Sequence, residues 1–197
     1  MKGKNKMATV DILIKGYNKE INDNFHRYAS TTTLVRSNDI NIVVDPGIHE
    51  SLDLYNESLK QYGLSTDDID YVFCTHEHLD HTRDIAVFKN AAVIDRWGTH
   101  KGDEHHFDEL EEKEIIPQVK RVLTLGHGLN HVSLLVETNK GVVCVAGDLW
   151  WYEDLTPAED DYATDQKELE KSREKILKIA DFIIPGHGGL VKNIMKG

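Results

Sequence analysis

The feature that most constrains this chain is a run of metal-binding side chains directly after a short apolar stretch. The stretch Tyr71–Cys74 has the composition of a buried strand, and the next seven residues read THEHLDH. Residues two apart in an extended chain point the same way, so His76 and His78 are placed to bind one ion together. The chain would then turn, with Asp80 and His81 facing a second ion where a helix begins. Imidazole and carboxylate both suit zinc, and polar groups beside a buried strand are costly unless something binds them.

Three further candidate ligands follow strand-like runs at glycine-containing turns. His127, Asp148 and His187 each stand beside a glycine where an apolar run ends. Loops at the ends of strands are where proteins commonly place binding and catalytic groups. Each is a weak signal alone, because a glycine-flanked polar residue is common in turns. Together with the THEHLDH run they make seven candidate ligands, enough for two ions once a solvent oxygen bridges them.

The periodicity of apolar residues predicts more strands than helices. Helical spacing covers Glu50–Tyr62 and Asp165–Ala180, and a short helix is expected from Asp80 through Phe88. This pattern favours mixed sheets covered by helices, in an α/β or α+β single domain. The expected strands are β-branched runs bounded by turn residues: Val10–Lys15, Thr31–Arg36, Ile40–Val44, Tyr71–Thr75, Ala91–Asp95, Arg121–Leu125, His131–Thr138, Gly141–Ala146 and Phe182–Pro185.

Length and composition fit one domain over residues 1–197, with residues 1–7 as a disordered tail. No apolar run approaches the roughly 20 residues that span a bilayer, and no secretory leader pattern follows Met1, so a cytoplasmic protein without a membrane partner is expected. The two cysteines, Cys74 and Cys144, lie in apolar runs and are expected to be buried and reduced. They form no CxxC pair, which excludes a cysteine zinc knuckle.

The net charge of the chain bears on whether it binds nucleic acid. The chain has 23 basic and 34 acidic residues, a formal net charge of −11. Nucleic-acid binding usually needs a basic face, so the balance disfavours RNA, although bound metal ions would add local positive charge. The acidic segment 102–114 is the one compositional outlier. It is expected to be a solvated loop or helix surface, with a lid or an oligomer contact as the alternative.

The order of these motifs resembles the metallo-β-lactamase-fold superfamily over essentially the whole chain. The resemblance rests on HxHxDH, then GH, GD and PGHG, and on the early strand-turn Val43–Gly47. It implies an αββα four-layer sandwich with the metals at one edge between two sheets. It also implies a division of the ligands: His76, His78 and His127 for one ion, Asp80, His81 and His187 for the other, with Asp148 bridging. Asp45 and His131 would orient these ligands.

The same resemblance implies a metal-dependent hydrolase with two divalent ions, expected to be Zn²⁺, with Fe²⁺ or Mn²⁺ as alternatives. A hydroxide bridging the two ions would attack the substrate, and Asp80 would hold it and move a proton. The expected substrate is a small molecule with an ester, lactone, thioester or phosphoester bond. The aromatic run Trp150-Trp151-Tyr152 directly follows Asp148 and is expected to line the substrate cleft in part.

Two other functions stay open. The layout is similar to a small single-domain branch of the superfamily with a member associated with RNA cleavage, which suggests a metal-dependent ribonuclease or phosphodiesterase. A mononuclear iron dioxygenase uses the same scaffold and much of the motif. The sequence also leaves a homodimer open. Histidines outside the motifs are expected at the surface or beside the substrate: His26, His49, His100, His105 and His106.

Overall fold

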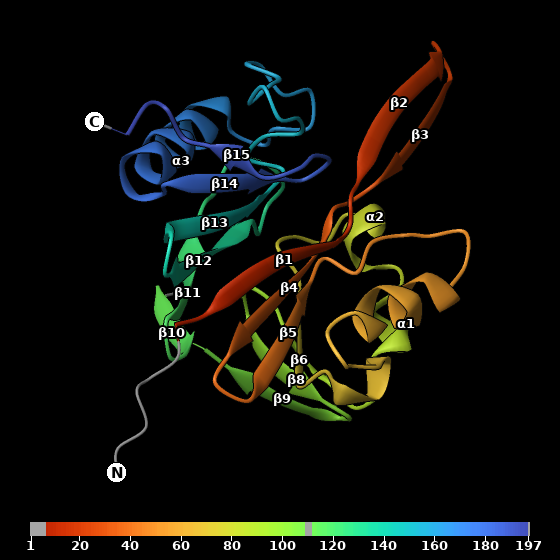
Figure 1. Cartoon of the computed structure of the whole chain (residues 1–197). Coiled ribbons are helices and arrows are strands. Elements are labelled where there is room, and N and C mark those ends of the chain that lie inside the picture. Colours follow the sequence, from red (N-terminus) through yellow and green to blue (C-terminus); the bar gives the residue numbers. More distant parts are fainter. Residues whose placement is uncertain (1–6, 109–111, 197) are drawn as a thin grey trace.

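Two β-sheets form the centre of the molecule in the computed structural model, which describes residues 7–108 and 112–196. The first sheet has the order β1-β4-β5-β6-β7-β8-β9 and the second β10-β11-β12-β13-β14-β15 (Figure 1). The first comprises β1 (Thr9–Ile14), β4 (Thr32–Ser37), β5 (Ile40–Val44), β6 (Tyr71–Phe73), β7 (Ala92–Ile94), β8 (Gly98–Lys101) and β9 (Glu104–Phe107). The second comprises β10 (Lys113–Ile116), β11 (Val119–Leu123), β12 (Val132–Thr138), β13 (Gly141–Gly147), β14 (Phe182–Pro185) and β15 (Val191–Lys192).

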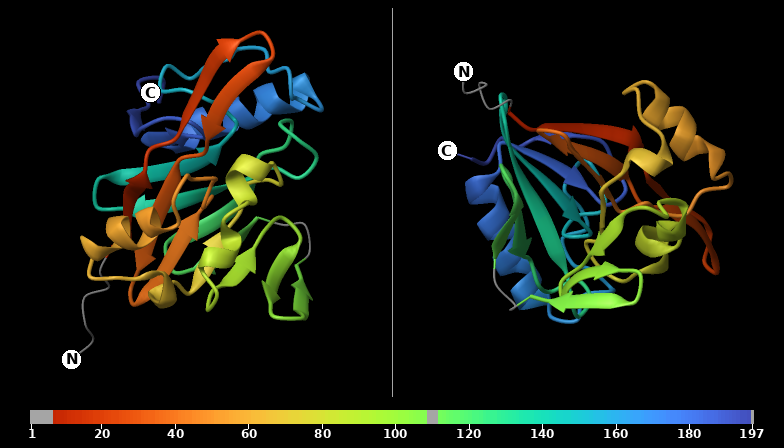
Figure 2. Two further views of the ribbon diagram at one scale, coloured as in Figure 1. Left: turned by 90° about the vertical axis from the view of Figure 1, so that its right-hand side faces the viewer. Right: turned by 90° about the horizontal axis from the view of Figure 1, so that it is seen from below.

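The sheets pack face to face, with helices on the two outer faces. Figure 2 shows α1 (Asp53–Lys60) outside the first sheet and α3 (Gln166–Ile179) outside the second. Strand alternation divides the apolar residues among three layers. Val44 packs between the sheets, for example, whereas its neighbour Val43 faces the cluster of α1. This arrangement confirms the expected αββα sandwich.

The β6–β7 connection is less helical than expected. The predicted helix from Asp80 to Phe88 is a single short α-helix, α2 (Leu79–Thr82), followed by a 3₁₀ turn over Ile85–Val87. A second 3₁₀ turn covers Thr66–Asp68. The break leaves α2 as a turn that carries Asp80 and His81, both buried, toward the sheet edge.

A two-stranded hairpin that periodicity did not predict projects from the body of the molecule (Figure 1). Its strands are β2 (Tyr17–Asn22) and β3 (Phe25–Ala29), and they pair only with each other among the described residues. The acidic segment 102–114 also differs from the expected loop or helix surface, because it contains β9 and the start of β10. Its residues 109–111 lie outside the described part of the chain.

The remaining expectations from composition concern the tail, the cysteines and the membrane. Residues 1–6 of the expected tail lie outside the described residues. Cys74 packs under α1 and Cys144 under α3, so the two thiols are buried, free and in different layers. Within the described residues, no helix combines the length and the apolar character needed to cross a bilayer.

Candidate metal centre

The seven candidate ligands come from both sheets and meet at one edge. His76 and His78 follow β6 in the first sheet, and α2 then presents Asp80 and His81. The second sheet supplies ligands from loops after three of its strands. These are His127 after β11, Asp148 after β13 and His187 after β14. The sandwich therefore brings together groups as far apart in the sequence as His76 and His187, as the motif order predicts.

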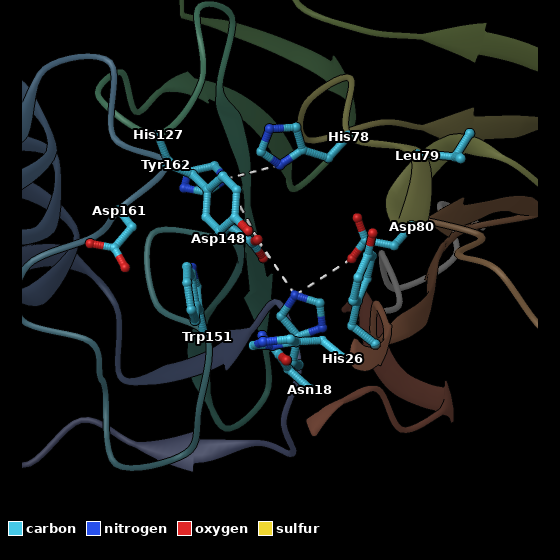
Figure 3. Close-up of a pocket in the computed structure, with 12 residues that line it drawn as sticks. Asn18, His26, His78, Leu79, Asp80, His127, Asp148, Trp151, Asp161 and Tyr162 are labelled. Atoms are coloured by element: carbon cyan, nitrogen blue, oxygen red, sulfur yellow. Dashed lines mark hydrogen bonds and ion pairs between the residues drawn. The ribbon is translucent and has the colours of Figure 1, made fainter. Parts of the chain in front are cut away.

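The ligands form two groups. His76, His78, His127 and Asp148 offer atoms that all lie within 4.8 Å of one another, and Asp80, His81 and His187 do the same. Asp148 faces both groups: Oδ2 lies 3.6 Å from Nε2 of His127, whereas Oδ1 lies 3.2 Å from Nε2 of His81. The same Oδ2 lies 3.5 Å from Nε2 of His187, so the carboxylate contacts residues of both groups, and Figure 3 shows it between His127 and Asp80.

Asp45 orients ligands of both groups. Its Oδ2 accepts hydrogen bonds from the Thr75 hydroxyl at 2.8 Å and from His81 Nδ1 at 2.9 Å. Because the Thr75 hydrogen goes to Asp45, the Thr75 oxygen accepts from His76 Nδ1 at 2.9 Å. Both imidazoles therefore carry their hydrogen on Nδ1 and direct an Nε2 lone pair at the site.

The other two Nε2 ligands are held in the same way. His127 Nδ1 donates to Asp160 Oδ2 at 2.6 Å, and His187 Nδ1 donates to the Ala29 carbonyl at 3.0 Å. His78 differs, because it turns Nδ1 inward, 3.2 Å from His127 Nε2. Sequence reasoning did not find Asp160, since an aspartate in an acidic, irregular segment carries no motif.

Several buried polar atoms of the site lack a hydrogen-bond partner within the described residues, as expected of atoms that bind a metal ion. His76 Nε2, His81 Nε2 and Asp148 Oδ1 are buried without a hydrogen-bond partner among the described residues. The 3.2 Å pair of His81 and Asp148 is close enough for an ion pair but lies outside hydrogen-bond geometry. Buried polar atoms of this kind are costly unless something binds them. Nitrogen-rich sets with a few carboxylates suit zinc, and also iron and manganese.

The electrostatics favour positive charge at the second group. Burial lowers the pKa of His81, but the carboxylates of Asp148 and Asp45 outweigh it and hold that pKa well above its usual value. Burial raises the pKa of Asp148, and His81 and His187 then bring it well below its usual range. In the first group, burial and the neighbouring His81 hold the pKa of His76 well below 6.5. The two groups therefore differ in how readily protons compete with a metal ion.

His131, the other residue expected to orient ligands, is fully buried beside them. Its Nδ1 pairs with the Thr124 hydroxyl at 3.0 Å, and its ring lies 5.1 Å from that of His76. Its Nε2 has no hydrogen-bond partner among the described residues. Asp45 thus orients ligands through hydrogen bonds, whereas His131 packs against the ligand rings.

A cavity of about 300 Å³ opens over the two groups. Of the aromatic run, Trp151 lines this cavity, whereas Trp150 is buried in the core under α3 and so departs from the expectation. Tyr152 packs edge-on against Trp151, with ring centroids 6.3 Å apart. The hairpin and the loop after β13 supply wall residues, most of which no motif marks: Asn18, His26, Tyr28, Asp161 and Tyr162.

Known proteins share this arrangement of motifs and fold. The profile of the Metallo-beta-lactamase superfamily matches residues 27–187.

The chain belongs to the metallo-β-lactamase superfamily.

Individual relatives agree with this assignment. "Metallo-beta-lactamase domain-containing protein 1" of Xenopus laevis is 32% identical over 196 residues, which cover 96% of this chain and 83% of that protein. The chain spans about three fifths of the length of the mammalian proteins of the same name. An "N-acyl homoserine lactonase" of Bacillus cereus is 26% identical over 66% of this chain and 60% of the lactonase. A "probable metal-dependent hydrolase" structure from Staphylococcus aureus superposes with a TM-score of 0.76 at 16% identity, over 98% of this chain and 95% of its own.

The superfamily, its lactonase and hydrolase members and the two ligand groups together indicate that the protein is a metal-dependent hydrolase.

Proposed function

We propose that the protein is a dinuclear zinc hydrolase that cleaves an ester or lactone bond. The observation that carries the proposal is the position of Asp148 between two complete ligand groups. A carboxylate shared by two cations offsets their mutual repulsion, which is severe at about 4 Å. The first group, with His76, His78 and His127, and the second, with Asp80, His81 and His187, would each hold one ion.

Bound ions would supply a water activated near neutral pH and a Lewis acid for the scissile carbonyl. The protein's own groups then position the reactants. Asp80 lines the cavity, and its Oδ2 lies 3.6 Å from Nε2 of both His81 and His187. Its carboxylate is placed to accept a proton from the attacking water and to deliver one to the leaving oxygen. Trp151 and Tyr162 line one wall of the cavity above these groups.

The walls of the cavity favour an acyl substrate over an anionic phosphodiester. None of the described residues that line the cavity is a lysine or arginine. The aromatic side chains of Tyr28, Trp151 and Tyr162 do line it. Proteins that bind nucleic acid neutralise several phosphates with such cations. The formal charge of −11 points the same way. A ribonuclease is therefore the weaker candidate, and the completeness of the second group disfavours a mononuclear dioxygenase.

A substrate panel tests the proposal. Zinc-loaded protein would be assayed on 4-nitrophenyl butyrate, an alkyl lactone, a thioester, bis(4-nitrophenyl) phosphate and a single-stranded oligoribonucleotide. We expect the ester or the lactone to be the best substrate, with activity lost to a chelator and restored by Zn²⁺. Asp80→Asn should lower the rate by about 10²- to 10⁴-fold, whereas the exposed Asp154→Asn should not. Preferred cleavage of RNA or the phosphodiester would contradict the proposal.

A further inference from the structure

The cavity over the metal centre has an inner end and an outer end of different chemistry. The floor consists of the candidate ligands, whereas the outer walls come from the β2–β3 hairpin on one side and the loop after β13 on the other (Figure 3). The loop wall carries Trp151, Asp161 and Tyr162. Bound metal would make the floor positive, because two divalent ions exceed the charge of Asp80 and Asp148.

Asp161 gives the outer wall a negative charge that no cationic side chain among the described residues neutralises. Among the described residues that line the cavity, it is the one carboxylate outside the ligand groups. Its side chain is exposed, and in the described part of the chain no lysine, arginine or histidine nitrogen lies within ion-pair distance of it. Its neighbour Asp160 is engaged instead, because it holds His127. Within the described part of the chain, the charge of Asp161 is therefore available to a ligand in the cavity.

Two aromatic rings accompany this carboxylate. The centroids of Trp151 and Tyr162 lie 5.8 Å apart with their planes inclined by 45°. Tyr162 is 63% exposed and lines the cavity, so its ring is accessible to a bound ligand. Its backbone is nevertheless fixed, because the Tyr162 amide donates to Asp160 Oδ1 at 2.8 Å. Aromatic rings and a carboxylate in one cavity are the groups that recognise ammonium cations.

We propose that Trp151, Asp161 and Tyr162 form a subsite for a cationic group, so that the substrate is an ester or lactone that carries an ammonium group away from the scissile bond. The inference rests on the proposed hydrolase function and adds the charge of the substrate. The reacting carbonyl binds at the floor, and the ammonium binds at the outer wall. Because bound metal repels a cation, the ammonium must be separated from the carbonyl by a spacer.

Matched esters test this subsite. Three 4-nitrophenyl esters with the same spacer would end in a methyl, a trimethylammonium or a carboxylate group, and the cationic series would include short, medium and long methylene spacers. We expect kcat/KM to be about tenfold higher for the best cationic ester than for its neutral counterpart. The carboxylate ester should be the poorest of the three. The preference should disappear for the shortest spacer.

Asp161→Asn should remove most of the preference for the cationic ester, measured as the ratio of kcat/KM for the cationic and the neutral ester. The matched control is Glu159→Gln. Glu159 is an exposed acid two residues before Asp161, and it does not line the cavity. Glu159→Gln should keep the preference for the cationic ester if that preference comes from binding at Asp161 and not from the net charge of the protein. Equal effects of the two variants, or a wild-type preference for neutral or anionic esters, would overturn the subsite.

A binding measurement separates this inference from the proposed function. Butyltrimethylammonium would be titrated calorimetrically into zinc-loaded wild-type, Asp161→Asn and Glu159→Gln protein. We expect saturable binding to the wild type and to Glu159→Gln, and binding weakened by about fivefold or more in Asp161→Asn. If no ester is cleaved but this pattern holds, the proposed reaction is wrong and the subsite stands. Cleavage of the neutral ester without any binding of the cation would refute the subsite alone.

Discussion

At the residue scale, Asp45 shows how one side chain positions ligands of both groups. Its carboxylate accepts from the Thr75 amide and hydroxyl and from His81, and its backbone has a φ of 48°. A non-glycine residue in this left-handed region costs about 1–3 kcal/mol. The surrounding hydrogen bonds hold it there, and the strain is localised where the ligands need a fixed orientation.

Asp45→Asn should therefore weaken metal binding although it leaves all seven candidate ligands unchanged. The amide would present a donor toward His81 Nδ1 or Thr75, so at least one hydrogen bond is lost. We expect metal affinity to fall by about 10- to 100-fold, most at the group that contains His81. Competition with a chromophoric chelator measures this. Asp39→Asn, an exposed turn residue, is the control and should bind metal normally.

The opposite pKa shifts of the two groups predict the order in which acid releases the ions. Burial lowers the pKa of all four imidazoles, and in His76 and His78 it prevails. In His81 the carboxylates of Asp148 and Asp45 outweigh burial and raise the pKa, and in His187 Asp148 does so. A raised pKa means that protons displace metal at higher pH. Lowering the pH from about 8 to about 6 should thus empty the second group first. Metal analysis after dialysis at each pH would refute this if the ions leave together or in the reverse order.

At the scale of elements, the regular core could be predicted and the site walls could not. Strands β5, β12, β13 and β14 are β-branched and buried, so periodicity located them. The hairpin β2–β3 was missed because its residues are mostly polar and solvated on both faces. Likewise, metal ligands follow a recognisable motif, whereas Asp161 and Tyr162 lie in an irregular loop that only the tertiary fold brings to the cavity.

Contact between α3 and the loop that carries His127 depends on Gly126. A Cβ at Gly126 would lie 2.2 Å from the Leu169 amide nitrogen, and the residue has a φ of 123°. Gly126→Ala should reduce the free energy of unfolding by roughly 3 kcal/mol, from overpacking and backbone strain together. Gly128 in the same loop has a φ of 63° but open space around it, so Gly128→Ala should cost only about 1 kcal/mol.

Thermal denaturation of the two glycine variants measures this difference. For a chain of this length 1 kcal/mol corresponds to about 2–4 °C in Tm. The Gly126→Ala protein should therefore melt at least about 4 °C below Gly128→Ala. Equal melting temperatures would show that α3 does not constrain the loop.

For the whole molecule, the sandwich and the metal centre should stabilise each other. The ligands come from both sheets, so ions would cross-link the two halves at one edge. An ion that binds only the folded state stabilises that state by mass action, by about 2.7 kcal/mol at an ion concentration of a hundred times Kd. We expect a chelator to lower the Tm by roughly 5–10 °C per ion removed. Calorimetry with and without Zn²⁺ checks this, and an unchanged Tm would argue against the cross-link.

The central claim is that two ions share Asp148, and metal stoichiometry tests it most directly. The wild-type chain and Asp148→Asn would be metal-depleted, reloaded with excess Zn²⁺, desalted and analysed by mass spectrometry for metal per chain. Because an amide is a poor bridging ligand, we expect close to two ions per wild-type chain and close to one in the variant. A wild-type protein that stays at one ion in excess zinc, or a variant that retains two, would contradict it.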